Sequence, residues 1–284
     1  MFVYLCTSSR GQLADFWIEE EVAGTFASAS SLIWDPTEHL LFLAEDEQGI
    51  AQVFRIDPGS GKSEKLTNDT ISKIALSFDQ ANDKLLISLV KAGKKTVIRH
   101  DESILNAEPL IPRQLQHEQA HVNAKGNMAA FIGKEENERH WNLYTYDFVY
   151  NNLNKLGSTN ADHAYPLWSP NADLLSFESR QPDESFTKLR VIHWYGKIHL
   201  EIADNDYHIK QASWSPNNQW LAYVMENFGS SKLVICRKNG TDKTIIYESS
   251  RKISYPVWSA SGSSIAFMLS DDNGQTKIYQ LFQH

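Results

Sequence analysis

Three histidines stand at nearly the same place before a large apolar residue that recurs along the chain, and together they could bind a metal ion. His117 and His163 lie five residues before copies of that apolar residue, and His208 lies six before another. Converging neutral imidazoles are good ligands for transition metals. We therefore identify His117, His163 and His208 as a candidate metal site. The main alternative is a structural role, because no carboxylate recurs beside them and their position is not histidine in every copy.

The other residue patterns that could do chemistry are incomplete. The segment 59–63 (Gly-Ser-Gly-Lys-Ser) resembles the end of a phosphate-binding loop, but Ile56 occupies the position of the first glycine. The sequence contains no Gly-x-Ser-x-Gly elbow, and its cysteines and histidines have no spacing that suggests a nucleophilic pair. Cys6 and Cys236 fit the role of small buried apolar residues. We therefore expect no bound cofactor; the sequence leaves open whether the protein is an enzyme and favours one that is not.

These residues lie within a repeat that organises the whole chain. A short sequence motif recurs six times, and each copy contains one large apolar residue, called here the anchor. The anchors are Trp34, Phe78, Val122, Trp168, Trp214 and Trp258. Their spacings are 44, 44, 46, 46 and 44 residues. Because tryptophan recurs at one structural position, we interpret the anchors as core residues rather than as a ligand-binding box.

Each repeat contains further short apolar runs separated by turn residues, which indicates strands. One example after the anchor is the run 174–177, and later runs in another repeat are 232–235 and 244–247. Four strands, A to D, in about 45 residues are typical of one blade of a β-propeller. The sequence therefore predicts an all-β protein, a β-propeller of four-stranded antiparallel blades, forming one domain over residues 1–284.

The number of blades depends on how the chain ends are counted. Residues 2–6, 15–20 and 24–28 match strands B, C and D of a first unit without its strand A, and the last unit stops before a strand D. The resulting 26 strands exceed six four-stranded blades and fall short of seven. We favour seven blades with incomplete terminal blades. Six blades with a displaced terminal hairpin are the alternative.

The repeats resemble those of TolB-type propellers, also called WD40-like or PD40 repeats. The segments that carry the resemblance are 165–171 (Tyr-Pro-Leu-Trp-Ser-Pro-Asn), 213–218 (Ser-Trp-Ser-Pro-Asn-Asn) and 255–259 (Tyr-Pro-Val-Trp-Ser). Similar repeats occur in a periplasmic translocation protein, in oligopeptidase propellers and in oligogalacturonate lyases, some of which carry a metal. The resemblance implies the fold, and it leaves several functions open.

Charge and the N-terminal sequence limit the classes of partner. The chain has 35 acidic and 27 basic residues and a net charge of −8, which disfavours binding to nucleic acid. The N-terminal segment lacks the basic start and long apolar run of a signal peptide or membrane span. We therefore expect a cytoplasmic location and no membrane span. Another protein, with a basic surface, is the expected partner.

Loop lengths suggest where such a partner would bind. The B-to-C loops differ in length, whereas the A-to-B turns are nearly uniform, and variable loops on a rigid scaffold often carry recognition. Several of these loops place acidic residues beside an aromatic ring. The predicted contact residues are Trp141, Phe186, Phe228, Glu136, Glu138, Asp183 and Glu184. The predicted function is a non-catalytic scaffold for protein–protein interaction through this variable-loop face. The alternative is a channel-mouth ligand-binding protein or a metal-dependent polysaccharide lyase-like enzyme.

Overall fold

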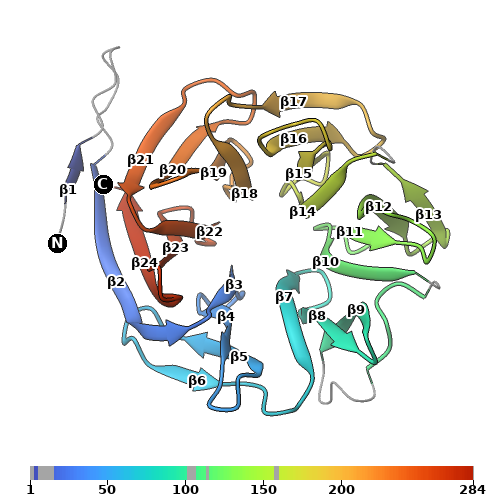
Figure 1. The fold of residues 1–284 in the computed structure, drawn as a ribbon, viewed down its shortest axis with the longest axis horizontal. Helices are drawn as coiled ribbons and strands as arrows, with labels where there is room; N and C mark the ends of the chain where they lie inside the picture. Colours follow the sequence, from blue (N-terminus) through green and yellow to red (C-terminus); the bar gives the residue numbers. More distant parts are fainter. Residues whose placement is uncertain (1–2, 6–15, 101–106, 113–114, 157–159, 284) are drawn as a thin grey trace.

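The computed structural model describes residues 3–5, 16–100, 107–112, 115–156 and 160–283, and these residues form β-strands and turns without an α-helix. Six antiparallel sheets surround a central axis as the blades of a propeller (Figure 1). The predicted fold class is therefore confirmed. The ring has six blades, the alternative count, rather than the favoured seven.

The strands of the first three blades follow the chain order from the axis outwards. Blade 1 contains β3 (Ser30–Trp34), β4 (Leu40–Glu45), β5 (Ala51–Ile56) and β6 (Ser63–Lys65). Blade 2 contains β7 (Ser72–Asp79), β8 (Lys84–Lys91) and β9 (Lys94–His100), and Pro109 forms a bridge to Ile98 of β9. Blade 3 contains β10 (Gln116–Val122), β11 (Met128–Lys134), β12 (Asn142–Asp147) and β13 (Asn152–Lys155).

The remaining blades repeat the same arrangement, with one difference in the last. Blade 4 contains β14 (Asp162–Trp168), β15 (Leu174–Arg180), β16 (Lys188–His193) and β17 (Ile198–Ile202). Blade 5 contains β18 (His208–Trp214), β19 (Trp220–Asn227), β20 (Ser230–Arg237) and β21 (Thr244–Ser249). Blade 6 contains β22 (Lys252–Trp258), β23 (Ser264–Ser270) and β24 (Gln275–Gln283), followed by β2 (Phe16–Ala27) and β1 (Val3–Leu5).

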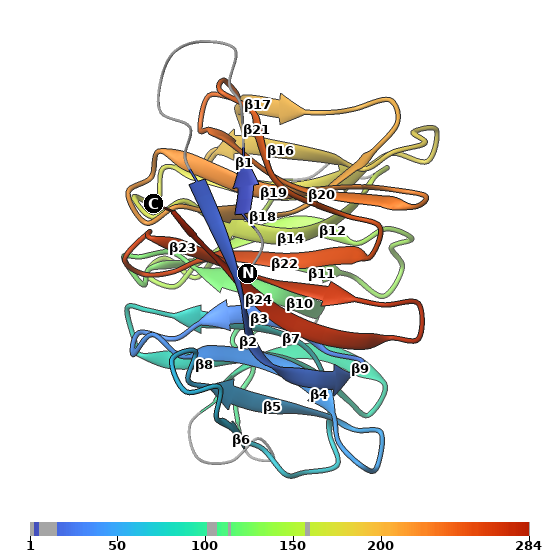
Figure 2. The same cartoon turned by 90° about the vertical axis from the view of Figure 1, so that its left-hand side faces the viewer.

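The two ends of the chain close the ring within blade 6. Strand β2 pairs antiparallel with β24, with Glu20 opposite Gln280, and it lies along the outer side of the disc (Figure 2). Residues 16–20 and 24–27 of the segments expected as two strands belong to this single strand, which continues through bulges near Glu21 and Ala23, while residue 15 lies outside the described residues. The N-terminal segment therefore supplies the missing fourth strand of the last blade. This pairing explains why six blades suffice.

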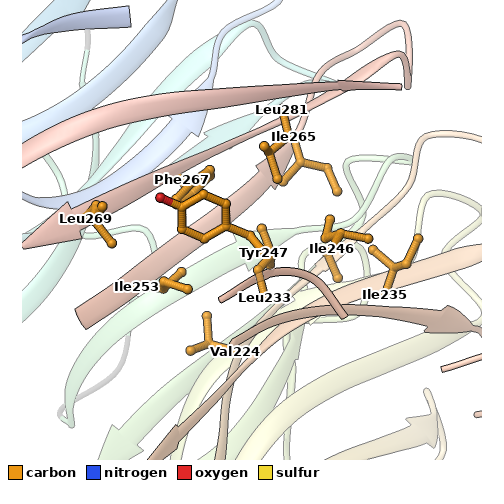
Figure 3. Packing of buried hydrophobic residues seen from close by; sticks show 11 residues of the cluster. Val224, Leu233, Ile235, Ile246, Tyr247, Ile253, Ile265, Phe267, Leu269 and Leu281 are labelled. Atoms are coloured by element: carbon orange, nitrogen blue, oxygen red, sulfur yellow. The ribbon is translucent and has the colours of Figure 1, made fainter. Parts of the chain in front are cut away.

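Apolar side chains between neighbouring blades form the core. Figure 3 shows one such cluster, in which Leu233 and Ile246 of blade 5 pack with Ile253 and Phe267 of blade 6. The second strand of each blade is buried on both faces, as its nearly continuous apolar sequence indicates. The anchors Trp168 and Trp214 are 3% and 6% exposed and are core residues, as expected, whereas Trp34 and Trp258 are partly buried against the clusters between blades.

The residue after each anchor explains the recurring turn sequence. The Ser169 hydroxyl accepts a hydrogen bond from the backbone N–H of Leu174 at 3.0 Å, and the Ser215 hydroxyl accepts one from Trp220 at 2.9 Å. In blade 1, Asp35 Oδ1 accepts hydrogen bonds from the N–H groups of Thr37 and His39. Short oxygen-bearing side chains stabilise turns in this way, which is why Ser, Asp or Asn follows the anchor.

Candidate functional site

A cavity of about 500 Å³ occupies the propeller axis and is the candidate functional site. Its walls are the inner strands of all six blades, β3, β7, β10, β14, β18 and β22. The lining runs from three residues before each anchor to the A-to-B turn that follows it. The cavity therefore lies on the A-to-B side of the disc, whereas the variable B-to-C loops lie on the other side. Volumes of 300–1,000 Å³ are usual for small-ligand sites.

A backbone irregularity marks the inner end of this lining. In five blades the residue three before the anchor has a positive φ, between 50° and 58°. These residues are Ser31, Gln119, Tyr165, Gln211 and Tyr255. Each lies at a bulge between strands A and B, where the backbone N–H leaves the regular ladder and needs another acceptor.

The preceding blade supplies that acceptor, and the kind of acceptor alternates. Tyr165 N–H donates to Gln119 Oε1 at 2.7 Å, and Tyr255 N–H donates to Gln211 Oε1 at 2.9 Å. The Gln211 N–H instead donates to Glu178 Oε1 at 2.8 Å, and the Gln119 N–H donates to the Ser88 hydroxyl at 2.9 Å. These bonds connect successive blades around the axis and fix the orientation of both glutamine amides.

Two tyrosines narrow the inner end of the cavity. The hydroxyl groups of Tyr165 in blade 4 and Tyr255 in blade 6 lie 3.3 Å apart, and the rings meet edge to face with centroids 6.1 Å apart. Burial raises the pKa of both phenols above the usual range, so both are neutral at physiological pH. We call this contact the tyrosine pair.

His121 lies in the cavity wall and has a defined neutral form. Burial lowers its pKa to about 4, because the interior disfavours the imidazolium. The backbone N–H of Trp168 donates to His121 Nδ1 at 3.3 Å. A nitrogen that accepts a hydrogen bond carries no proton, so the proton of neutral His121 is on Nε2. The side chain therefore presents an N–H donor.

The described residues that line the cavity include no lysine, arginine or glutamate, and Asp35 is their single carboxylate. Asp35 is 9% exposed, and its Oδ1 atom is engaged in the A-to-B turn. Glu178, which is buried and is not among the lining residues, accepts the Gln211 N–H at a bulge, and burial raises its pKa to about 7. The cavity thus has apolar walls with a few neutral polar groups.

The three histidines of the predicted metal site lie elsewhere, at or near the start of the inner strands. His117 Nδ1 lies 3.1 Å from the Leu115 carbonyl oxygen, the His163 ring packs edge to face on Phe177, and His208 Nδ1 accepts a hydrogen bond from the Thr187 N–H at 3.1 Å. None of the three lines the cavity. Across the described ranges, no three His, Cys, Asp or Glu side chains form a group suited to a metal ion.

The aromatic residues predicted to contact a partner differ in accessibility. Phe228 is fully exposed at the turn between β19 and β20. Trp141 is half-buried and packs against the core between blades 3 and 4, with the Lys95 ammonium 4.5 Å from its ring centroid. Phe186 is also half-buried and meets the His208 ring edge to face. Phe228 is therefore the fully exposed member of this set.

The acidic residues predicted to contact a partner also differ, in exposure and in whether they pair with a neighbouring side chain. Glu136 and Asp183 are exposed. Glu138 pairs with Lys155 and also accepts hydrogen bonds from the Glu135 N–H and the Tyr144 hydroxyl. Glu184 forms an ion pair with Lys188 at 2.6 Å. Glu138 and Glu184 therefore stabilise their own loops, while Glu136 and Asp183 are available to attract a basic surface.

The sequence prediction did not include Gln119, Gln211, His121 or Glu178 among the site residues. A signal for the two glutamines was present, because the third residue before the anchor reads Ser, Ala, Gln, Tyr, Gln, Tyr along the six repeats. A polar or aromatic residue at a fixed position of the innermost strand indicates a channel lining. Glu178 gave no such signal, since strand B is otherwise apolar at the positions around it.

Comparisons with known proteins support the architecture. A protein from Agrobacterium tumefaciens provisionally assigned as TolB matches with a TM-score of 0.66 and 13% identity, over 90% of this chain and 91% of that one. TolB from Acinetobacter baumannii matches with a TM-score of 0.59 and 18% identity, over 77% of this chain and 54% of that one. The fold is that of a TolB-type β-propeller.

A second group of propellers has a comparable likeness. An oligogalacturonate lyase from Vibrio parahaemolyticus matches with a TM-score of 0.58 and 10% identity, over 99% of this chain and 96% of that one. No protein-family model and no curated protein sequence matches the chain. The described part of this TolB-type propeller has no helix with the length and apolar character needed to cross a membrane.

Proposed function

We propose that this propeller is a non-catalytic scaffold that binds another protein. The observation that carries the proposal is a set of exposed apolar side chains on the C-to-D side of two neighbouring blades. The set, named here the turn surface, comprises Val149, Tyr150, Trp194, Tyr195 and Ile198, which are 51–81% exposed. Exposed apolar side chains that lie together on a folded protein are a common feature of binding sites.

Local structure holds the turn surface in place. The Asp147 carboxylate accepts hydrogen bonds from the N–H groups of Val149 and Tyr150, at 2.8 and 3.0 Å. In the next blade, the Tyr195 ring stacks on His193 with centroids 5.2 Å apart and meets Trp194 edge to face. Aromatic side chains that are held in position lose little conformational entropy on binding, and tyrosine and tryptophan are frequent interface hot spots.

The turn surface lies on the opposite side of the disc from the contact residues predicted in the sequence. On the variable-loop face, Phe228 has the exposure of an anchor, and Glu136 and Asp183 have the charge to attract a basic partner. We place the main contact on the turn surface because it presents four aromatic or branched apolar side chains from two turns, and a further one at the start of β17. Contact through Phe228 is the alternative location.

A polysaccharide lyase is the competing function, suggested by the similar fold of the Vibrio enzyme. An acidic saccharide needs cations to compensate its carboxylates, yet the described cavity lining offers no lysine or arginine. Metal content and release of unsaturated product from polygalacturonate test this alternative. Stoichiometric metal together with turnover would favour the lyase.

Matched variants of the two faces test the scaffold proposal. A partner is first captured from native lysate and purified, and its affinity is then measured for three forms of the chain. We expect Tyr150→Ser with Trp194→Ser to weaken binding at least tenfold, because a hot-spot aromatic contributes about 2 kcal/mol or more. Phe228→Ser should leave the affinity unchanged. The reverse pattern would move the contact to the variable-loop face, and equal affinities for all forms would contradict both locations.

A further inference from the structure

The axial cavity has the features of a binding site for a small molecule, a role separate from protein binding at the turn surface. It is enclosed by all six blades and has a volume of about 500 Å³. Apolar residues such as Ile33, Phe78 and Leu167 form much of its wall. Concave sites that combine apolar walls with a few fixed polar groups are typical of ligand pockets.

Two hydrogen-bond donors on one inner strand require a ligand that carries a hydrogen-bond acceptor. Gln119 lines the cavity, and its Oε1 atom accepts the Tyr165 N–H, so the amide nitrogen is the group of this side chain that remains to donate to a ligand. His121 Nδ1 accepts the Trp168 N–H, so His121 offers its Nε2–H. Both residues lie on β10, two positions apart. Both donors are oriented by backbone groups of the next blade, so a ligand does not have to reorganise them.

Charge defines what the ligand must lack. Among the described lining residues the carboxylate of Asp35 is engaged in its turn, and no basic side chain is present. His121 is neutral, as are the phenols of the tyrosine pair. An anion that entered would meet no lysine or arginine among these lining residues. A cation would meet only Asp35, whose Oδ1 atom already accepts two backbone N–H groups. Either ion would therefore lose hydration with little compensation, which is unfavourable.

We propose that the cavity binds an uncharged small molecule that carries a carbonyl or amide oxygen on an apolar body. The oxygen accepts hydrogen bonds from Gln119 Nε2 and His121 Nε2, and the apolar body contacts the aliphatic and aromatic wall. The tyrosine pair limits how far the molecule extends along the axis. The ligand enters from the side of the A-to-B turns, which line the other end of the cavity.

Three probes of similar shape and different charge test the proposal, namely benzamide, benzoate and benzylammonium. Because Trp34, Trp168, Trp214 and Trp258 line the cavity, tryptophan fluorescence reports binding, and ligand-detected NMR gives an independent value. We expect saturable binding of benzamide and at least about tenfold weaker binding of both ions. Failure of benzamide to bind saturably, or binding of benzoate as tight as that of benzamide, would overturn the proposal.

Two substitutions locate the bound probe. Gln119→Glu retains an oxygen for the Tyr165 N–H but removes the amide donor, and His121→Phe retains an aromatic ring but removes the N–H donor. Each should weaken benzamide binding by about tenfold, the usual effect of losing one well-placed hydrogen bond. Gln48→Glu, at an exposed B-to-C turn, is the matched control and should bind like the parent.

The variants also separate failure to bind from failure to fold. Unfolding midpoints in denaturant are measured for every form, and affinity is compared among forms whose midpoints match the parent. If Gln119→Glu and His121→Phe both fold and bind benzamide like the parent, the assigned donors are wrong. If Gln48→Glu weakens binding equally, the probe is not in the cavity. Neither result affects the turn-surface proposal, which depends on other residues.

Discussion

The hydroxyl group of Tyr165 in blade 4 lies 3.3 Å from the hydroxyl group of Tyr255 in blade 6. These blades are not neighbours in the ring, since blade 5 separates them. The tyrosine pair therefore connects two blades directly across the axial space, in addition to the blade-to-blade hydrogen bonds at the bulges. It makes the inner end of the cavity part of the fold's own hydrogen-bond network.

Removing either hydroxyl should reduce stability. We expect Tyr165→Phe and Tyr255→Phe each to lower the free energy of unfolding by about 1 kcal/mol, because each removes the partly buried hydrogen bond between the two hydroxyl groups. The double variant should lose less than the sum of the single effects, since the two groups share one contact. Denaturant titration of the parent, the two single variants and the double variant gives the four free energies of unfolding for a double-mutant cycle. Additive losses would show that the hydroxyls do not interact in solution.

Closure of the ring by β2 gives a second prediction. Val22 is 7% exposed and packs in the cluster between blades 6 and 1 with Leu32 and Phe42. Val22→Asp would bury an unpaired carboxyl there, and we expect a loss of about 3 kcal/mol in the free energy of unfolding. Thr25→Asp, at an exposed position of the same strand, should change it by no more than about 0.5 kcal/mol. Equal effects of the two substitutions would contradict closure through β2.

The blade architecture could be predicted from the sequence because each of blades 1 to 5 is formed by one continuous stretch of the chain. The strands of one such blade occupy about 45 consecutive residues, and the anchors Trp168 and Trp214 repeat with that spacing. Closure could not be predicted in the same way, because it pairs Glu20 with Gln280 at opposite ends of the chain. Apolar periodicity reports which residues are buried, but it does not report which distant strand covers an edge.

The anchor tryptophans give a third prediction. Trp168 and Trp214 are almost fully buried, and Trp214 Nε1 donates to the Ser176 hydroxyl of the preceding blade at 3.1 Å. Replacing either with alanine should cost about 3–5 kcal/mol, as is usual for a truncated buried aromatic. Trp194→Ala, at a half-exposed turn, is the control and should cost far less. A midpoint for Trp168→Ala or Trp214→Ala within error of the parent would contradict the core assignment.

The candidate site was less predictable than the fold, for a physical reason. Histidine is a familiar metal ligand, so His117, His163 and His208 gave the strongest chemical signal in the sequence. The structure places their rings against neighbouring strands and loops, where Phe177 and the Thr187 N–H contact two of them. The cavity chemistry depends instead on bulges that release single backbone N–H groups, and a bulge leaves no clear mark in an apolar pattern.

Glu178 gives a prediction about the dependence of stability on pH. Its carboxyl is buried, it accepts the Gln211 N–H, and its charged neighbours are Lys210, which favours ionisation, and Glu226, which opposes it. Desolvation is the dominant effect and raises the pKa from 4.5 to about 7. The folded state therefore retains the proton over a pH range in which the unfolded state has lost it.

The sign of the effect follows from this difference. Below pH 4.5 both states are protonated, and the contribution of Glu178 to stability is fully present. Between pH 4.5 and about 7 the contribution is lost, by about 3 kcal/mol in total, and above pH 7 no further change is expected.

Glu178→Gln keeps an oxygen for the Gln211 N–H and has no proton to lose. Between pH 4.5 and about 7, the free energy of unfolding of the parent should therefore fall by about 3 kcal/mol relative to that of Glu178→Gln. Glu136→Gln, at an exposed position, should run parallel to the parent. Stability curves for Glu178→Gln and the parent that stay parallel from pH 4.5 to 8 would show that this carboxyl does not titrate as a buried acid.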